Sequence, residues 1–237
     1  MKYLSFVLLC SLFIFSSCEE DGSEPSIETF LPKLVMSGES DVNLNCSTTS
    51  YSDPGVVATE NGQNVDLIVN TAGRYFGSSI INTADIYDIS YTAYNKDSIP
   101  GTAFRTVFLP PCNGDMVSSI EGVYTSTIVR NGSTSAQYTN LKYILIKKVG
   151  DNSYQLSDAI GGYYDFGRQY GPHYAATNMV VTNNGGAYSS DDIIPVGDFE
   201  GNLSLTDFTV DSASKTIKFT TDWDAGFVFE VTLQQAN

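Results

Sequence analysis

The fold class is decided by the stretch TIKFTTDWDAGFVFEVTL, residues 216–233, in which apolar and polar side chains alternate on both sides of one turn. The alternating apolar positions are Ile217, Phe219, Phe227, Phe229, Val231 and Leu233. A period of two residues is that of a β-strand with one buried face. Asp224-Ala225-Gly226 is a turn signal between the two runs, so the stretch predicts an antiparallel hairpin.

The same alternation recurs along most of the chain. From Tyr87 to Ala93 every second residue is apolar, and turn signals rich in Gly, Asn and Asp separate such runs from one another. Beyond the N-terminal segment, no run shows the 3.6-residue period of an amphipathic helix. Half-buried strands with one wet face are typical of antiparallel sheets. The sequence therefore predicts an all-β protein.

The stretch PPCNGD, residues 110–115, is the best internal boundary, because two successive prolines cannot both donate hydrogen bonds to a sheet. Residues 30–111 have the size of an immunoglobulin-like sandwich. Residues 116–237 predict an eight-stranded antiparallel meander, closed into a barrel or folded into a sandwich. The eight predicted strands span residues 123–128, 141–148, 154–158, 174–182, 192–196, 203–210, 216–221 and 227–233.

The N-terminus predicts a secretory signal peptide over residues 1–17. Lys2 supplies a positive charge, residues 4–15 are an apolar run (LSFVLLCSLFIF), and two serines precede Cys18. The apolar run is shorter than the roughly 20 residues that a membrane-spanning helix needs. The sequence from Phe15 to Cys18 resembles the bacterial lipobox, which implies cleavage before Cys18 and lipidation of that cysteine.

An acidic segment follows, residues 18–29, with five carboxylates and no Lys or Arg before Lys33. Like charges of this density predict a solvated tether between the lipid and the folded part. The segment also resembles the export signal of Bacteroidetes surface lipoproteins. That resemblance implies a location on the outer face of the outer membrane.

Cys46 and Cys112 are the cysteines left beyond the signal peptide and the lipidated residue. In an oxidising compartment they can form a disulfide or remain two separate small hydrophobes, and sequence does not supply the Cα separation that decides between them. The chain has no Cys-x-x-Cys pair, so the sequence does not indicate a structural zinc site.

The charge balance restricts the partners. Twenty-seven acidic residues against 12 basic ones give a formal net charge of −15, which is the wrong sign for a nucleic-acid partner. Aromatic residues make up 12% of the chain, too many for a disordered acidic polymer. An acidic field repels anionic polymers, so a neutral glycan is the predicted partner if the protein binds a polysaccharide.

Both halves resemble known families. YSDPGVVA at residues 51–58 and YDISYTA at residues 87–93 resemble bacterial immunoglobulin-like modules. EGVY at residues 121–124, YQLSD at 154–158, GGYYDFGRQYGPHYAA at 161–176 and WDAGF at 223–227 look like the uncharacterised C-terminal domain of lipoproteins from Bacteroidetes polysaccharide-utilisation gene clusters. This resemblance implies a role in glycan handling at the cell surface and brings no established catalytic residues.

The richest segment for recognition is residues 161–174, where five Tyr or Phe rings mix with polar side chains and glycines. Sugars stack their C–H faces on aromatic rings and bind polar groups through their hydroxyls. In a β domain most such rings pack in the core or across strands. The candidate glycan-binding residues are Tyr164, Tyr170, His173 and Trp223.

A catalytic site is less well supported. His173 is the single histidine, and no Gly-x-Ser-x-Gly motif occurs. Asp222 with Asp224 or Glu230 could form a glycosidase pair, and Asp222 and Asp224 share a strand face that could hold calcium. In a chain this acidic neither pattern is specific, so no catalytic residue, metal ligand or cofactor is predicted.

These observations predict a non-catalytic, surface-anchored lipoprotein that binds or presents glycan for polysaccharide uptake, together with other surface uptake proteins. Two other classes stay open. One is a structural or protein-interaction component of a surface complex, with the N-terminal half as a spacer. The other is a glycosidase or lyase.

Overall fold

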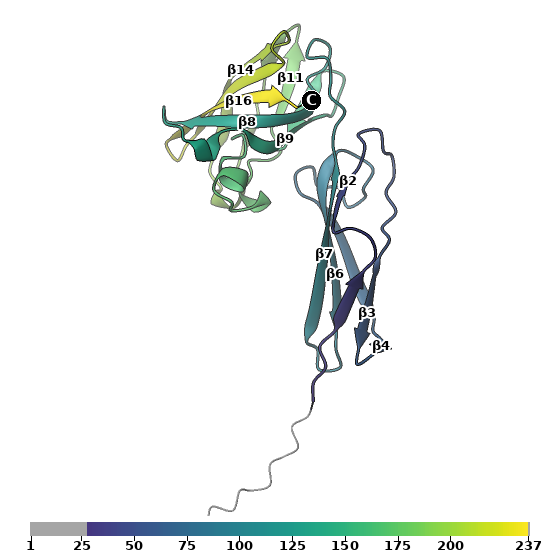
Figure 1. Ribbon diagram of the computed structural model, residues 1–237. Coiled ribbons are helices and arrows are strands. Elements are labelled where there is room, and N and C mark those ends of the chain that lie inside the picture. Colours follow the sequence, from purple (N-terminus) through teal and green to yellow (C-terminus); the bar gives the residue numbers. More distant parts are fainter. Residues whose placement is uncertain (1–27, 237) are drawn as a thin grey trace, which may run out of the picture. The chain divides into compact units, whose positions relative to one another are not determined.

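The computed structural model describes residues 28–236, and the residues from Leu31 onward form one compact unit (Figure 1). The signal peptide, Cys18 and most of the acidic tether predicted from the sequence lie outside the described residues. The described residues form three sheets, which confirms the all-β prediction. In the described part, no helix has the length and apolarity to cross a membrane.

The N-terminal half consists of two sheets with strand orders β1-β3-β4 and β2-β7-β6-β5. Their strands are β1 (Lys33–Met36), β2 (Asp41–Asn43), β3 (Val56–Glu60), β4 (Gln63–Asn64), β5 (Leu67–Gly73), β6 (Asp85–Tyr94) and β7 (Pro100–Leu109). All pairs are antiparallel except β2 with β7. Tyr87 and Tyr91 of β6 are fully buried, and Leu34 and Val56 of the other sheet pack against the same core. The two sheets therefore form a sandwich.

One arginine links the two sheets of this sandwich. Arg105 on β7 is 1% exposed; it forms an ion pair with Asp53 and donates to the Ser37 carbonyl oxygen. The Tyr91 hydroxyl donates to the other oxygen of Asp53 at 2.6 Å. A buried charge without such partners would be strongly destabilising, so Asp53 fixes the loop before β3 against the strands of the second sheet.

Cys46 and Cys112 form a disulfide, with their Cα atoms 4.9 Å apart. The bond ties the loop after β2 to the chain that leaves β7, across a sequence separation of 66 residues. It closes the sandwich at the point where the chain enters its C-terminal half.

The C-terminal half is one nine-stranded sheet in the order β12-β11-β10-β9-β8-β16-β15-β14-β13 (Figure 1). Its strands are β8 (Gly122–Arg130), β9 (Leu141–Lys148), β10 (Ser153–Leu156), β11 (Val180–Asn184), β12 (Ala187–Ser189), β13 (Ile193–Ile194), β14 (Leu203–Asp211), β15 (Thr216–Trp223) and β16 (Phe227–Gln235). Consecutive strands pair antiparallel except β12 and β13, which are the two edges of the sheet, and the first strand, β8, pairs with the last, β16. The sheet curls into a half-barrel in which the edge strand β12 comes into contact with β14, where the rings of Tyr188 and Phe208 lie 5.2 Å apart between centroids.

The predicted hairpin has the expected register, with Trp223 opposite Phe227 and Phe219 opposite Val231. Two details differ from the predicted meander. Residues 174–182 are a strand only from Val180, because residues 172–174 form a short helical turn, and Ala187–Ser189 adds a ninth strand. The interior of the curled sheet is filled by its own inward-facing side chains and by the segment that joins β10 to β11.

We expect loss of the disulfide to weaken the fold through the unfolded state, because the bond restricts a loop of 66 residues. The double substitution Cys46→Ala, Cys112→Ala should lower the free energy of unfolding by about 4 kcal/mol. Urea denaturation followed by Tyr fluorescence measures this change. Unchanged unfolding of the wild type with and without reductant would contradict it.

Candidate functional site

The segment between β10 and β11 is held inside the half-barrel by one carboxylate. Asp158 is fully buried and accepts hydrogen bonds from the backbone N–H groups of Ile160 at 2.9 Å, Gly162 at 3.1 Å and Ala176 at 3.1 Å. Thr221 of β15 donates to the carbonyl oxygen of Ala159 at 3.0 Å. Both ends of the segment are therefore fastened in the interior of the sheet.

Glycine is required where this segment touches the sheet. Gly161 has φ +68°, and a Cβ there would lie 2.7 Å from both Ser126 Oγ and Val231 Cγ1. A left-handed backbone and this close approach both exclude larger residues. The glycine thus serves packing against β8 and β16. The chain then forms one turn of π-helix, η3 (Tyr163–Gly167), a feature that is frequent at functional sites.

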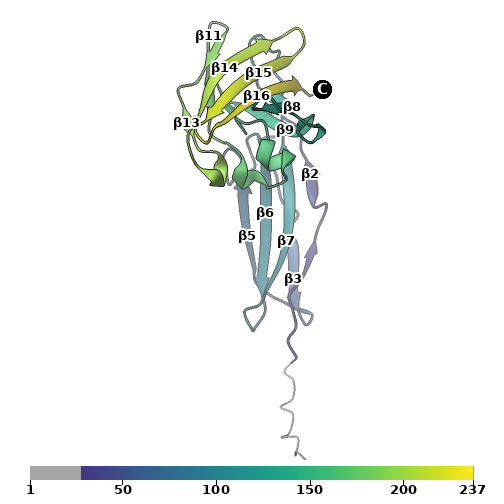
Figure 2. The same ribbon diagram turned by 90° about the vertical axis from the view of Figure 1, so that its left-hand side faces the viewer.

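Three short helical turns lie together at one end of the curled sheet: η3, η4 (Pro172–Tyr174) and η5 (Gly197–Phe199) (Figure 2). Together with the chain between η3 and η4 and with the adjoining ends of β15 and β16, they bring six rings into one group, which we call the ring cluster. Its members are Tyr164, Tyr170, Tyr174, Phe199, Trp223 and Phe227. The centroid of Tyr164 is 4.8 Å from that of Phe199 and 6.3 Å from that of Trp223. Phe199 and Trp223 follow Tyr164 by about 35 and 60 residues in the sequence, so distant segments contribute to this one group.

The ring cluster has a buried floor and an exposed top. Tyr164 and Trp223 are 8% and 6% exposed, whereas Tyr170 and Phe199 are 51% and 43% exposed. Tyr170 is stacked on Tyr164 with ring planes 10° apart, and its centroid lies 6.3 Å from that of Phe199. The exposed pair therefore presents apolar ring surface to solvent on a rigid aromatic base.

The structure brings together three of the four residues predicted to bind glycan. Tyr164, Tyr170 and Trp223 share the ring cluster, but Tyr164 and Trp223 are covered. His173 is exposed on η4 and is linked to the cluster through its chain neighbour Tyr174. Sequence reasoning missed Phe199. Its signal is an aromatic ring in the short loop GDFEG, outside any alternating run.

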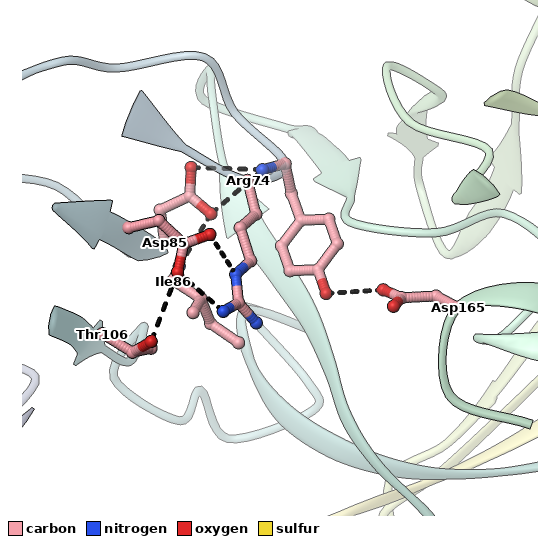
Figure 3. A network of polar contacts seen from close by, with 7 residues as sticks. Arg74, Asp85, Ile86, Thr106 and Asp165 are labelled. Atoms are coloured by element: carbon pink, nitrogen blue, oxygen red, sulfur yellow. Dashed lines mark hydrogen bonds and ion pairs between the residues drawn. The ribbon is translucent and has the colours of Figure 1, made fainter. Parts of the chain in front are cut away.

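The second acidic residue of the segment has a structural contact. Asp165 of η3 accepts a hydrogen bond from the Tyr75 hydroxyl at 2.7 Å (Figure 3). Burial raises the pKa of Asp165, and it is also the main cause of the raised pKa of Tyr75. This bond joins the π-helix to the loop between β5 and β6.

The loop that carries Tyr75 is itself fixed by polar contacts (Figure 3). Asp85 accepts hydrogen bonds from the backbone N–H groups of Phe76 at 2.9 Å and Ile86 at 2.7 Å. Arg74 donates two hydrogen bonds to Asp88, at 2.8 and 2.7 Å. The carboxylates in this network are engaged in holding backbone and side chains in place.

Two of the acids considered for catalysis or calcium, Asp222 and Asp224, are the chain neighbours of Trp223. Asp222 and Asp224 line one shallow pocket with Ile193, Asn202 and Ser204, and Asn202 donates to Asp224 at 2.7 Å. Glu230 is exposed on β16, opposite Thr220. Within residues 28–236, no group of three or more His, Cys, Asp or Glu side chains is placed to hold a metal ion.

Residues 113–235 match the model of a protein family described as a "-like, C-terminal domain". The match covers more than half of the chain. The chain belongs to this C-terminal domain family. Its C-terminal half is therefore a family domain.

The fold is similar to a solved structure, the crystal structure of the lipoprotein BT2262 from Bacteroides thetaiotaomicron. The TM-score is 0.57, and the identity is 23% over 86% of this chain and 100% of that chain. No curated protein matches the sequence. The likeness to BT2262 shows that the two chains share a fold.

We expect Asp158 to make the stability depend on pH. Burial raises its pKa from 3.8 to about 7, so the folded protein binds this proton more tightly than the unfolded chain does. The free energy of unfolding should therefore fall as the pH rises from about 4 to about 7, by up to about 4 kcal/mol, and level off above that range. Urea denaturation at a series of pH values measures this change.

Asp158→Asn should reduce the change in the free energy of unfolding between about pH 4 and pH 7, because the amide binds no proton in this range. The variant should also be less stable throughout, since the amide nitrogen cannot accept a backbone N–H bond. Asp207→Asn, which removes an exposed carboxylate on β14, is the matched control and should keep the wild-type slope. Equal slopes for wild type and Asp158→Asn would contradict the assignment.

Proposed function

We propose that this protein is a surface-anchored lipoprotein of the outer membrane whose C-terminal domain binds glycan without cleaving it. The observation that carries the proposal is the exposed pair Tyr170 and Phe199 on the buried base of Tyr164 and Trp223. Large apolar rings exposed together at one place on a soluble domain commonly mark a binding surface. Their flat faces suit the C–H faces of a sugar ring.

The base of the ring cluster supports binding because it lowers the entropic cost of fixing the exposed rings when a ligand binds. Tyr170 is stacked on Tyr164, and Phe199 contacts both Tyr164 and Tyr174 at 4.8 Å between centroids. Side chains that are already held in one geometry lose little freedom when a ligand arrives. A pair of rings held in this way can serve as a preformed platform.

The positions of the acids favour binding over cleavage. Asp158 and Asp165, the buried carboxyl groups nearest the ring cluster in sequence, hold backbone N–H groups and the Tyr75 hydroxyl. Glycoside hydrolysis needs two carboxyl groups free to act on either side of a sugar bond. We therefore assign these two buried acids a structural role, which leaves the exposed Asp198 and Glu200 beside Phe199 as carboxylates next to the platform.

The anchor is supported by the sequence from Phe15 to Cys18, by the acidic segment that follows and by the description of BT2262 as a lipoprotein. A thioether-linked diacylglycerol on Cys18 would hold the folded part at a membrane surface. Glycan handling for polysaccharide uptake fits such a place.

A protein-interaction role is the second candidate. Ile68 on β5 and Phe104 on β7 are 59% and 63% exposed on one face of the β2-β7-β6-β5 sheet, on the two strands that flank β6. Exposed apolar groups on a sheet face can contact another protein. This role would use the N-terminal sandwich and leave the ring cluster unused.

We expect Cys18→Ala to abolish lipidation, because the thiol is the acceptor of the lipid. The variant should not incorporate radiolabelled palmitate and should leave the membrane fraction of the producing bacterium. Cys10→Ala, which removes a cysteine within the apolar run, is the matched control and should label normally. Palmitate incorporation by Cys18→Ala would contradict the proposed anchor.

We expect Tyr170→Ala and Phe199→Ala each to weaken glycan binding about tenfold, or about 1.4 kcal/mol, through loss of stacking. The urea midpoint should change little because both rings are exposed. Affinity electrophoresis against a polysaccharide panel measures the binding. Tyr94→Ala, which removes a ring 49% exposed on the N-terminal sandwich, is the control and should bind like the wild type.

Absence of binding to the whole panel by folded wild-type protein would overturn the glycan proposal. So would binding that neither ring substitution affects. Capture of a defined envelope protein, insensitive to added sugar and lost in Phe104→Ser, would instead favour the second candidate.

A further inference from the structure

The four arginines of the chain fall into two groups. Arg74 and Arg105 form ion pairs with Asp88 and Asp53 in the N-terminal half. Arg130 and Arg168 are not in either of the ion pairs found within residues 28–236. In a chain with 27 acidic residues, these two arginines of the C-terminal half instead lie over an aromatic ring.

Arg130 and Arg168 converge on the same tyrosine. The Cζ atom of Arg130 lies 4.7 Å from the ring centroid of Tyr163, and that of Arg168 lies 5.9 Å from it. Tyr138 is stacked on Tyr163 at 4.2 Å, and Arg168 also lies 5.9 Å from the Tyr138 ring. Two cations that approach one ring repel each other, so an anion between or beside them would be stabilising.

The electrostatics of the nearby phenols agree with this geometry. Burial raises the pKa of Tyr138, whereas the charges of Arg168 and Arg130 both act to lower it. Both guanidinium groups therefore lie within electrostatic reach of one hydroxyl. Guanidinium and phenol groups are hydrogen-bond donors, so the site offers donors suited to an acceptor-only group.

This arginine site is continuous with the ring cluster. Arg130 also lies 4.6 Å from the ring of Phe227, a member of the cluster. Tyr163 contacts Tyr164 at 5.0 Å between centroids, and Tyr164 carries the exposed ring of Tyr170. Two rings, Tyr163 and Tyr164, therefore connect the cations to the stacking platform.

We propose that Arg130 and Arg168 bind the carboxylate or sulfate group of an acidic sugar whose ring stacks on Tyr170 and Phe199. The planar fork of a guanidinium matches both anions. Arg168 and Tyr170, two residues apart in the segment, are both exposed, and Arg130 is half-buried. This proposal rests on the proposed function and names the class of its glycan.

The net charge of −15 favours a neutral glycan, but the local charge decides binding at short range. Asp198 and Glu200 are exposed on either side of Phe199, whereas Arg130 and Arg168 lie over the ring of Tyr163. An acidic sugar would therefore be oriented, with its anionic group toward Arg130 and Arg168. At physiological salt, charges elsewhere on the molecule are screened beyond about 8 Å.

Matched pairs of polysaccharides that differ only in charge test the proposal. Suitable pairs are polygalacturonate with its methyl ester, chondroitin sulfate with its desulfated, carboxyl-reduced form, and dextran sulfate with dextran. Wild-type protein should bind the acidic member of at least one pair at least tenfold more tightly than the neutral member. The preference should fall as sodium chloride rises from 0.05 to 0.5 M. Polygalacturonate carries only carboxylates and dextran sulfate only sulfates, so these two pairs show which of the two anions the site binds.

Arg168→Ala should reduce the preference for the acidic polysaccharide at least tenfold, while binding through stacking on the rings persists. Arg168→Lys should restore part of it, because the charge returns without the fork. Lys218→Ala is the matched control, since it removes one positive charge from an exposed position of β15 in the same domain. Arg130→Ala should act like Arg168→Ala if its urea midpoint is unchanged, and the exposed Arg168 provides the test if Arg130→Ala unfolds.

Three results would overturn the inference. Equal binding of acidic and neutral partners, unaffected by Arg168→Ala, would leave the proposed glycan function standing and remove the anion site. An equal loss in Lys218→Ala and Arg168→Ala would assign the preference to the general field of the domain. Failure of folded wild-type protein to bind any member of any pair would overturn this inference and the proposed function together.

Discussion

The buried carboxylate of Asp158 is the contact on which the C-terminal site depends. It accepts backbone hydrogen bonds from both ends of a segment that crosses the interior of the half-barrel, at Gly162 and at Ala176. Between these two points the chain carries Tyr164, Tyr170 and Tyr174, which form half of the ring cluster. Burial of the carboxyl group is costly, and three N–H donors offset part of that cost. The rings therefore owe their positions to a polar contact in the core.

The alternation of apolar residues predicted most of the fold, because strand period and turn chemistry are local properties. The hairpin of β15 and β16 has the register that its pattern indicates, with Phe219 opposite Val231. The prediction failed for residues 174–179, where buried alanines and aromatic rings resemble a strand. There the backbone of Ala176 bonds to Asp158, a partner 18 residues away, instead of to a neighbouring strand. A contact of this kind leaves no periodic trace in the sequence.

The same limit applies to the candidate site. Aromatic content correctly indicated residues 161–174 as a place where rings gather, but it does not show which of the rings are buried and which are exposed. Trp223 was predicted as a ligand contact, and its indole is 6% exposed beneath Phe199. Net charge likewise reports a sum over the molecule, whereas the two arginines at Tyr163 set the local field. Which acids are already bonded, such as Asp165 to Tyr75, becomes visible only when distant segments are brought together.

The loop that carries Phe199 shows how the platform is kept in place. Gly201 has φ +77°, and a Cβ there would lie 2.3 Å from Nε1 of Trp223, so only glycine lets the loop pack on the indole. Within the described residues this Nε1 has no hydrogen-bond partner, which costs on the order of 1–3 kcal/mol. The indole contacts Tyr164, Phe199 and Phe227, and these ring contacts provide the compensating stabilisation. A polar penalty tolerated beneath an exposed ring is consistent with selection for the position of that ring, because stability alone would favour a residue with no unpaired donor.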